Sequence, residues 1–256
     1  MKTGKTKIQW IAGAAAAGGF CFLLLLVLSG KEGCLDDPIR HFFYGLRSDA
    51  LTPLAIGITD LSNTKFIIAL CLILLILPQT RNIYGIPVSM GAIFVTILNK
   101  TMKHIIQRLR PEDIEHLVQE GGYSFPSGHS ITSMFVYGML LYLIWIHVKD
   151  RRLRNILSVL VMIPLVLVGP SRIYLGVHYP TDVLAGWCLG FAVLMAAIGV
   201  VQRITAGREK KSLQKSLQLS LIHISKRRKI AKDIRKIFTS ILKYDSIRVK
   251  EVNNGK

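Results

Sequence analysis

The sequence predicts an all-α membrane protein with six transmembrane helices. Hydrophobic residues make up 51% of the 256 residues, and the mean hydropathy is +0.42. The apolar residues gather in long runs of the kind that cross the ~30 Å hydrocarbon core of a bilayer. No run shows the strict alternation of apolar and polar residues that marks a half-buried strand. Charged residues beside such runs are costly unless they are paired or functional, so their positions guide the search for a site.

The first run, Ile8–Ser29, follows a short basic start, Met1–Lys7. A cleaved signal peptide is the alternative, but its apolar region is typically only about 7–15 residues long. We therefore expect a retained first transmembrane helix. The mixed segment Lys31–Asn63 is expected to be external, with one interfacial helix and a partly buried approach to the second span.

Five further runs predict the remaining spans. The second, Phe66–Pro78, is short and is expected to recruit residues before Lys65. The helix of the third, Ile83–Asn99, is expected to continue through Lys103 towards Arg110, where a polar loop over 111–129 begins. The last three spans are Ser130–His147, Ile156–Gly169 and Val183–Val201.

The basic residues predict the orientation. Those before the first span, at Arg81, at 149–154 and in the C-terminal tail fall on one side of the membrane, which the positive-inside rule places in the cytoplasm. Both termini are then cytoplasmic. Residues 203–256 contain 16 Lys or Arg and 4 Asp or Glu, so they hold +12 of the total charge of +18. Because this charge lies outside the apolar part, the sequence does not favour a nucleic-acid partner.

The tail, 205–256, has three interpretations. Isoleucine and other apolar residues recur at helical spacing among Lys and Arg over 226–245, which is typical of a basic amphipathic helix on an anionic membrane surface. A partly disordered charged tail is the second. The third is a non-native extension beyond about residue 218, since Leu219–Ile224 matches the translation of a common sequencing-transposon end.

Three polar clusters are expected to meet on the external face. Their key residues are Lys103 and Arg110-Pro111 after the third span, Pro126-Ser127-Gly128-His129 before the fourth, and Ser171-Arg172 with His178 and Asp182 before the sixth. Taken singly, each has an ordinary explanation, such as cationic side chains that extend to the interface or a hydrogen-bonded interfacial histidine. Their convergence favours a functional site. Arg108 and Lys100 are not among the key residues of these clusters, and we interpret them as head-group or interface residues.

The third cluster carries a nucleophile pattern. Pro180 is expected to open a helix, which puts Asp182 in its first turn, one turn after His178. A carboxylate there can orient the imidazole, and an Arg can grip phosphate oxygens. Nucleophilic attack on phosphorus is the chemistry that this set predicts.

The other two clusters suit phosphoryl transfer. Lys103, Arg110 and Arg172 would neutralise the charge on the phosphoryl oxygens. The helix start at Gly128 offers backbone N–H groups that the Ser127 hydroxyl extends, and His129 is placed as general acid. The four cysteines fit no metal spacing and no carboxylate cluster accompanies the histidines, so we predict neither metal nor other cofactor.

The three strings match K-x6-R-P, P-S-G-H and S-R-x5-H-x3-D in order. This pattern resembles the type 2 phosphatidic acid phosphatase family, also called the lipid phosphate phosphatase and vanadium haloperoxidase superfamily, over about Ile56–Val201. The resemblance implies a phosphatase core at 56–204, after a first helix and external segment at 1–55. It implies a phosphohistidine on His178, Asp182 as its orienter and His129 as acid and then base. The implied phosphate ligands are Lys103, Arg110, Ser127, Gly128 and Arg172.

The resemblance also implies a metal-independent lipid phosphatase whose partners are a lipid phosphate and the membrane lipids, with its site on the outer face of the cytoplasmic membrane. Undecaprenyl pyrophosphate is the leading substrate, while phosphatidylglycerophosphate, phosphatidate and diacylglycerol pyrophosphate stay open. Two alternatives remain: a phosphotransferase that passes the phosphoryl group to a lipid or sugar, and a non-enzymatic lipid-binding protein of the same fold. The sequence leaves the oligomeric state undecided.

Overall fold

The computed structural model describes the backbone of residues 2–253 and the side chains of 7–207 and 209–219. Within that range the chain is built from helices and loops. It divides into two compact units, Met1–Val201 and Gln202–Lys256. The elements are α1 (Lys2–Leu28), α2 (Gly33–Gly45), α3 (Leu51–Asp60), α4 (Thr64–Ile76), α5 (Pro78–Thr80), the π-helix η1 (Arg81–Gly85), α6 (Ile86–Ile106), α7 (Gly128–His147), α8 (Arg151–Tyr174) and α9 (Pro180–Asn253).

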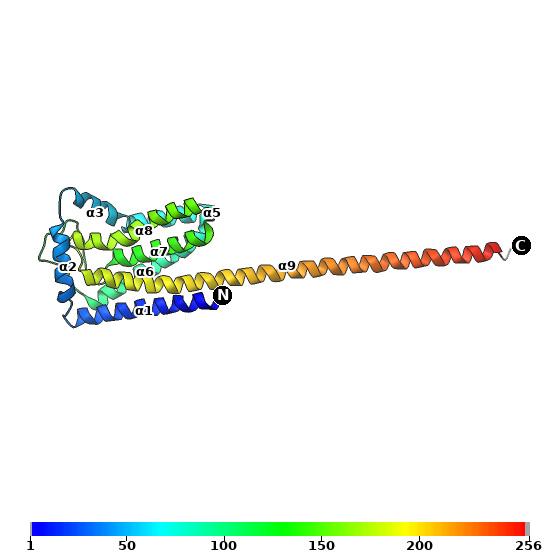
Figure 1. The fold of residues 1–256 in the computed structure, drawn as a ribbon, viewed down its shortest axis with the longest axis horizontal. Coiled ribbons are helices and arrows are strands. Elements are labelled where there is room, and N and C mark those ends of the chain that lie inside the picture. The colour runs from blue at the N-terminus through cyan, green and yellow to red at the C-terminus, as the bar shows by residue number, and fades with distance from the viewer. Residues whose placement is uncertain (1, 254–256) are drawn as a thin grey trace. The chain divides into compact units, whose positions relative to one another are not determined.

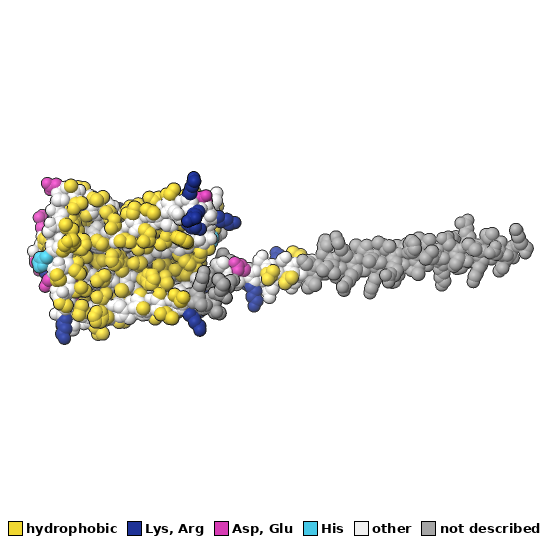
Figure 2. All heavy atoms as spheres, viewed as in Figure 1, with side chains coloured by type: hydrophobic (Ala, Val, Ile, Leu, Met, Phe, Trp, Pro, Cys, Tyr) yellow, Lys and Arg dark blue, Asp and Glu magenta, His cyan; other side chains and the backbone are white. Residues whose placement is uncertain are grey.

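The described helices include five candidate spans, and the count reaches the predicted six when one bent pair of helices is taken as a single span. Five are long and apolar enough to cross a membrane by themselves: Lys7–Leu28, Pro78–Ile106, Gly128–His147, Arg151–Tyr174 and Pro180–Leu219. The sixth is the pair α3 and α4, which are bent by 46° at their junction. The second span thus recruits residues before Lys65, as predicted. Apolar side chains cover the flank of the bundle between its two charged ends (Figure 2), which is the surface that a multi-pass membrane protein presents to lipid.

Helix α2 lies across one end of the bundle (Figure 1), in the segment where the sequence predicts an interfacial helix. Its carboxylate Asp36 is 1% exposed, although it stands in the first turn of a short helix. Arg47, just beyond α2, donates to the backbone carbonyls of Tyr174 and Glu115 at 3.0 Å each. The end of the segment that contains α2 is therefore tied to α8 and to the loop after α6.

Helix α7 is the most buried span and forms the centre of the core. Its apolar residues pack against α6 and α9 around Phe135, Met139 and Leu143, which are fully buried. Helix α9 approaches α7 through glycines. A Cβ at Gly186 would lie 2.8 Å from both the carbonyl oxygen of Ser127 and the Cβ of Ser130. Small residues permit such close contact between membrane helices, and here the contact sets the start of α7 against the start of α9.

Replacing Gly186 with alanine should therefore destabilise the protein. The added methyl group has no space against the α7 backbone, and overpacking of this kind costs about 1–3 kcal/mol. Gly18 on α1 is the matched control, because a Cβ there meets nothing within 4 Å. Thermal unfolding in detergent should show a lower melting temperature for Gly186→Ala and an unchanged melting temperature for Gly18→Ala. Equal melting temperatures for the two variants would contradict the close approach.

Two helix ends differ from the sequence-based boundaries. Helix α6 ends at Ile106 and does not continue towards Arg110, because Gln107 adopts a left-handed conformation with φ of 53°. Helix α8 extends through Tyr174, so Ser171 and Arg172 lie in its last turn. Helix α9 begins at Pro180 with Asp182 in its first turn, as predicted.

The second unit, from Gln202, is helical to Asn253. The side chains of 220–256 are outside the described residues, so the amphipathic surface over 226–245 stays a prediction. The division of the chain at 55 and 204 and the non-native extension beyond 218 also stay predictions.

Candidate functional site

The three predicted motifs meet at the end of the bundle that α2 covers. The backbone N–H of Ser127 donates to the carbonyl of Asp182 at 3.0 Å, which joins the second motif to the third. The Arg110 guanidinium donates to the carbonyl of Val177 at 2.7 Å, which joins the first motif to the third. The ends of α6 and α8 and the starts of α7 and α9 thus share one site.

His178 sits at the floor of this site with 1% of its surface exposed. Its Nδ1 lies 3.2 Å from Asp182 Oδ2, and its Nε2 lies 3.3 Å from an Arg110 nitrogen. Because a guanidinium can only donate and a carboxylate can only accept, these partners favour the tautomer with the proton on Nδ1. Burial, with the nearby Arg110, Arg172 and Lys103, holds the pKa of His178 well below its ordinary value. The imidazole is thus neutral at pH 7, with a lone pair on Nε2.

Three cations lie within electrostatic range of His178, and Arg110 is the one in contact with Nε2. Arg110 is held by the carbonyls of Gly122 at 3.1 Å and Gly121 at 3.0 Å, and burial lowers its pKa. Arg172 is 1% exposed and donates to the hydroxyl of Thr59 at 3.1 Å. Its Nε has no hydrogen-bond partner among the described residues. Lys103 interacts electrostatically with both arginines. We call the site formed by Arg110, Arg172 and Lys103 the cationic cup. It keeps an unused hydrogen-bond donor in Arg172 Nε.

The start of α7 forms one wall of the cup. Ser127 is the N-cap, and its hydroxyl accepts from the backbone N–H of Ser130 at 3.4 Å and from the Ser130 hydroxyl at 3.0 Å. It accepts in both bonds and keeps its own O–H proton to donate. A Cβ at Gly128 would lie 2.7 Å from Asn99 Nδ2, so only glycine fits without displacing that side chain. His129, one residue on, is within electrostatic range of His178, Arg172, Lys103 and Arg110.

The structure brings together all eight predicted site residues and adds others that the sequence analysis missed. Glu120, in the loop after α6, pairs with Arg172 and also lies 3.6 Å from Arg110. The interpretation of Arg108 as an interface residue is wrong: its guanidinium lies 2.7 Å from Asp182 and 2.7 Å from Asp36, with a side chain only 10% exposed. No motif includes Glu120 or Asp36, and no sequence spacing links them to the site.

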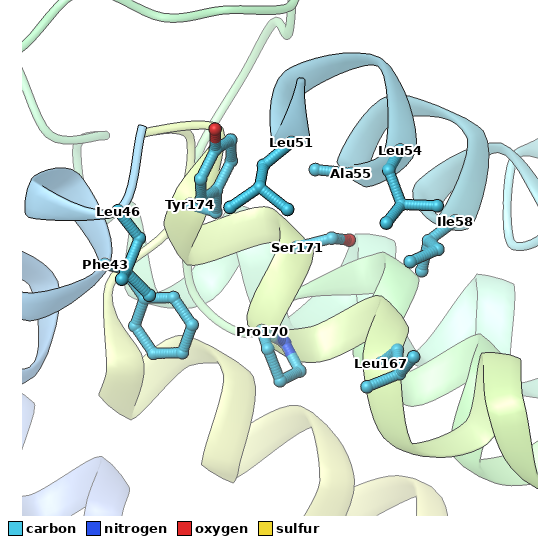
Figure 3. A pocket seen from close by; sticks show the side chains of 10 residues that line it. All are labelled: Phe43, Leu46, Leu51, Leu54, Ala55, Ile58, Leu167, Pro170, Ser171 and Tyr174. Carbon is cyan, nitrogen blue, oxygen red and sulfur yellow. The ribbon is translucent and has the colours of Figure 1, made fainter. Parts of the chain in front are cut away.

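A small apolar pocket of about 160 Å³ lies beside the site, between α2, α3 and α8. Side chains from the three helices point into it (Figure 3), among them Phe43, Leu54 and Pro170. Its wall includes Ser171 and Tyr174, so the last turns of α8 separate it from Arg172 and the cationic cup. With no charged residue in its lining, this pocket is not a place for phosphate.

No cluster of three or more His, Cys, Asp or Glu side chains suited to a metal ion occurs in the described part of the chain. The predicted absence of a metal requirement stays a prediction, to be tested with a chelator.

Comparison with known proteins agrees with the motif pattern. Residues 84–206 match the model of the PAP2 superfamily. The chain is 32% identical over 204 residues to phosphatidylglycerophosphatase B of Bacillus subtilis, which covers 75% of this chain and 97% of that protein. It is 33% identical over 143 residues to an undecaprenyl-diphosphatase of Sulfolobus acidocaldarius, which covers 52% of this chain and 64% of that protein.

A solved structure gives the same result for the fold. The crystal structure of a transmembrane PAP2-type phosphatidylglycerolphosphate phosphatase from Bacillus subtilis superposes with a TM-score of 0.68 at 29% identity. The superposition covers 75% of this chain and 96% of that one. The chain belongs to the PAP2 superfamily, as a membrane-embedded lipid phosphatase.

Proposed function

We propose that the chain hydrolyses a lipid phosphomonoester or pyrophosphate through a phosphohistidine formed on His178. One observation carries the proposal: the His178 ring has Nδ1 against the buried carboxylate of Asp182 and Nε2 against the guanidinium of Arg110. This arrangement orients a neutral nucleophile at the point where a phosphoryl group would be held by positive charge.

In the first step the Nε2 lone pair attacks phosphorus, and the bond from phosphorus to the leaving oxygen breaks. His129 donates a proton to that oxygen, while Asp182 stabilises the imidazolium that develops on His178. In the second step His129 takes a proton from water, and the water oxygen attacks phosphorus. The phosphorus–nitrogen bond breaks, and inorganic phosphate leaves with His178 neutral again.

The cations would bind the equatorial oxygens through both steps. Arg110 and Arg172 present planar guanidinium groups, which suit two-point contact with phosphate, and Lys103 adds a point charge. The N–H groups at the start of α7 and the Ser127 O–H proton would add further donors. Together these fixed charges stabilise the phosphoryl group as its charge spreads in the transition state.

A groove between α4 and α6 supports a lipid substrate. It has a volume of about 410 Å³ and is lined mainly by apolar residues that include Ile67, Ile93 and Ile97. Ser62, at its margin, donates a hydrogen bond of 3.0 Å to the backbone carbonyl of His129. The groove therefore reaches the backbone of the proposed acid, and a hydrocarbon chain in it would have its phosphate near the cup.

The relatives narrow the substrates to be tested first. The sequence analysis favoured undecaprenyl pyrophosphate, and the Sulfolobus relative bears that activity in its name. The Bacillus relative, aligned over 97% of its length, is named for phosphatidylglycerophosphate. We place these two lipids ahead of phosphatidate and diacylglycerol pyrophosphate.

We further propose that the site faces outward and that both termini are cytoplasmic. Arg81 and the basic start of α8, Arg151–Arg154, lie at the end of the bundle opposite the site, because α7 runs from the site to His147 and α8 returns from Arg151. The positive-inside rule then puts the site on the extracytoplasmic face.

Release of inorganic phosphate by the purified, detergent-solubilised protein tests the reaction. We expect release from at least one of the two favoured lipids without any acceptor, unchanged by EDTA, and none from the His178→Ala variant. Release that requires a lipid or sugar acceptor would instead indicate a phosphotransferase. Loss of activity in EDTA that added Mg²⁺ restores would contradict the metal-independent reaction.

A further inference from the structure

Two residues outside the motif positions occupy the space behind the His178–Asp182 pair. Arg108 Nη1 donates to Asp182 Oδ1 at 2.7 Å and to the Thr181 hydroxyl at 2.7 Å. Its Nη2 donates to Asp36 Oδ2 at 2.7 Å. The same guanidinium lies over the Tyr179 ring, 3.9 Å from its centroid. One side chain from the loop after α6 therefore contacts three of the four residues that follow His178.

Asp36 completes this arrangement from α2. Its Oδ1 accepts the backbone N–H of Thr181 at 2.8 Å, and its Oδ2 accepts the Thr181 hydroxyl at 2.8 Å. The first N–H groups of a helix have no partner within it, and a carboxylate near them is favoured by the helix dipole. Asp36 thus caps α9 from another helix, in the turn that carries Asp182.

The negative charges of Asp36 and Asp182 explain why the two carboxylates need the guanidinium of Arg108 beside them. Asp36 and Asp182 are 1% and 0% exposed, and a buried carboxylate left without a cation is strongly unfavourable. Arg108 lies between the two and pairs with both. Of the oxygens of Asp182, Oδ1 is held by Arg108, which leaves Oδ2 for His178 and for the backbone N–H of Tyr179 at 3.0 Å. Without Arg108 the Asp182 carboxylate would lose its ion pair and the hydrogen bond to Oδ1.

We propose that Arg108 and Asp36 are positioning residues of the reaction, which hold Asp182 and the first turn of α9 so that His178 Nε2 faces phosphorus. The proposal rests on the proposed role of His178 as the nucleophile. It assigns the external helix α2 a part in catalysis, although residue 36 lies outside the region 84–206 that matches the family model. Neither residue touches the cup, so their effect must appear in the rate of the chemical step and not in phosphate binding.

Asp36→Asn and Asp37→Asn form the test pair. Asp37 is the next residue on α2, has a side chain 54% exposed and pairs with Arg40, not with Arg108. The measurement is the single-turnover rate of phosphoenzyme formation per titrated active site, together with KM, on protein that is monodisperse in detergent. Supporting interactions of this kind typically change rate by about 10–100-fold. We expect such a fall for Asp36→Asn with KM within about twofold, and no change for Asp37→Asn.

Arg108→Lys provides the second variant and decides the matter alone if Asp36→Asn does not fold. Lysine keeps the charge but cannot bridge both carboxylates with a planar fork, so the same loss of rate at unchanged KM is expected. In the double variant the loss should be smaller than the product of the two single losses, since both remove one network. Wild-type rates per active site in the folded variants would overturn the positioning role. The His178→Ala variant, inactive or active, reports separately on the proposed function.

Discussion

Replacing His178 with alanine should abolish catalysis, with phosphate release lower by at least about 10³-fold. The reason is that alanine removes the proposed nucleophile, Nε2 of His178, the ring atom that lies 3.3 Å from Arg110. The loss should appear in the first step, so no phosphoenzyme should form with any lipid phosphate. The measurement is phosphate release and incorporation of labelled phosphate into the protein.

His104→Ala is the matched control for this variant. His104 lies in the last turn of α6, near the same end of the bundle, but it is exposed and outside the three motifs. Its replacement should leave phosphate release unchanged. Full activity in the His178→Ala variant would instead favour a different nucleophile or a directly attacking water molecule.

The His129→Gln variant should lose about 10²–10⁴-fold in turnover, the range that general acid–base groups contribute. The loss should depend on the leaving group. With an alkyl phosphate both steps slow, because His129 protonates the leaving oxygen in one and activates water in the other. With p-nitrophenyl phosphate, whose leaving group needs little protonation, phosphorylation of His178 should be nearly normal while hydrolysis stays slow. The phosphoenzyme should therefore accumulate.

Rapid-quench measurements of phosphoenzyme with the two substrates check this expectation. A burst of phosphoenzyme in the His129→Gln variant, larger than that in the wild type, supports the double role. An equal loss of the phosphorylation rate with both substrates would contradict the acid role. Glutamine retains hydrogen bonding at the position, so the comparison isolates proton transfer from packing of the start of α7.

The membrane helices could be predicted from the sequence because the bilayer requires long apolar runs, and these are visible residue by residue. The ends of the helices were harder to predict from the sequence. The end of α6 depends on the left-handed conformation of Gln107, which no hydropathy pattern indicates. The bend of 46° lies between the end of α3 at Asp60 and the start of α4 at Thr64, whereas the sequence predicts only that this span recruits residues before Lys65.

The site was predictable where its residues belong to the three motifs and was missed where they do not. Pro180, Asp182 and His178 define their own geometry through helix spacing, and the structure has that geometry. The contact of Arg108 with Asp36 joins positions 72 residues apart, and Glu120 meets Arg172 across 52 residues. A single sequence contains no signal for such pairs, because each partner taken alone resembles an ordinary charged residue near a membrane surface.

Mapping the phosphorylated residue tests the central claim most directly. The His129→Gln protein is mixed with p-nitrophenyl phosphate, quenched at alkaline pH, at which phosphohistidine is stable, and digested for mass spectrometry. We expect one phosphate per active chain, on His178, lost on acid treatment and absent from the His178→Ala/His129→Gln double variant. Phosphate on another residue, or rapid turnover by the double variant, would contradict a reaction through His178.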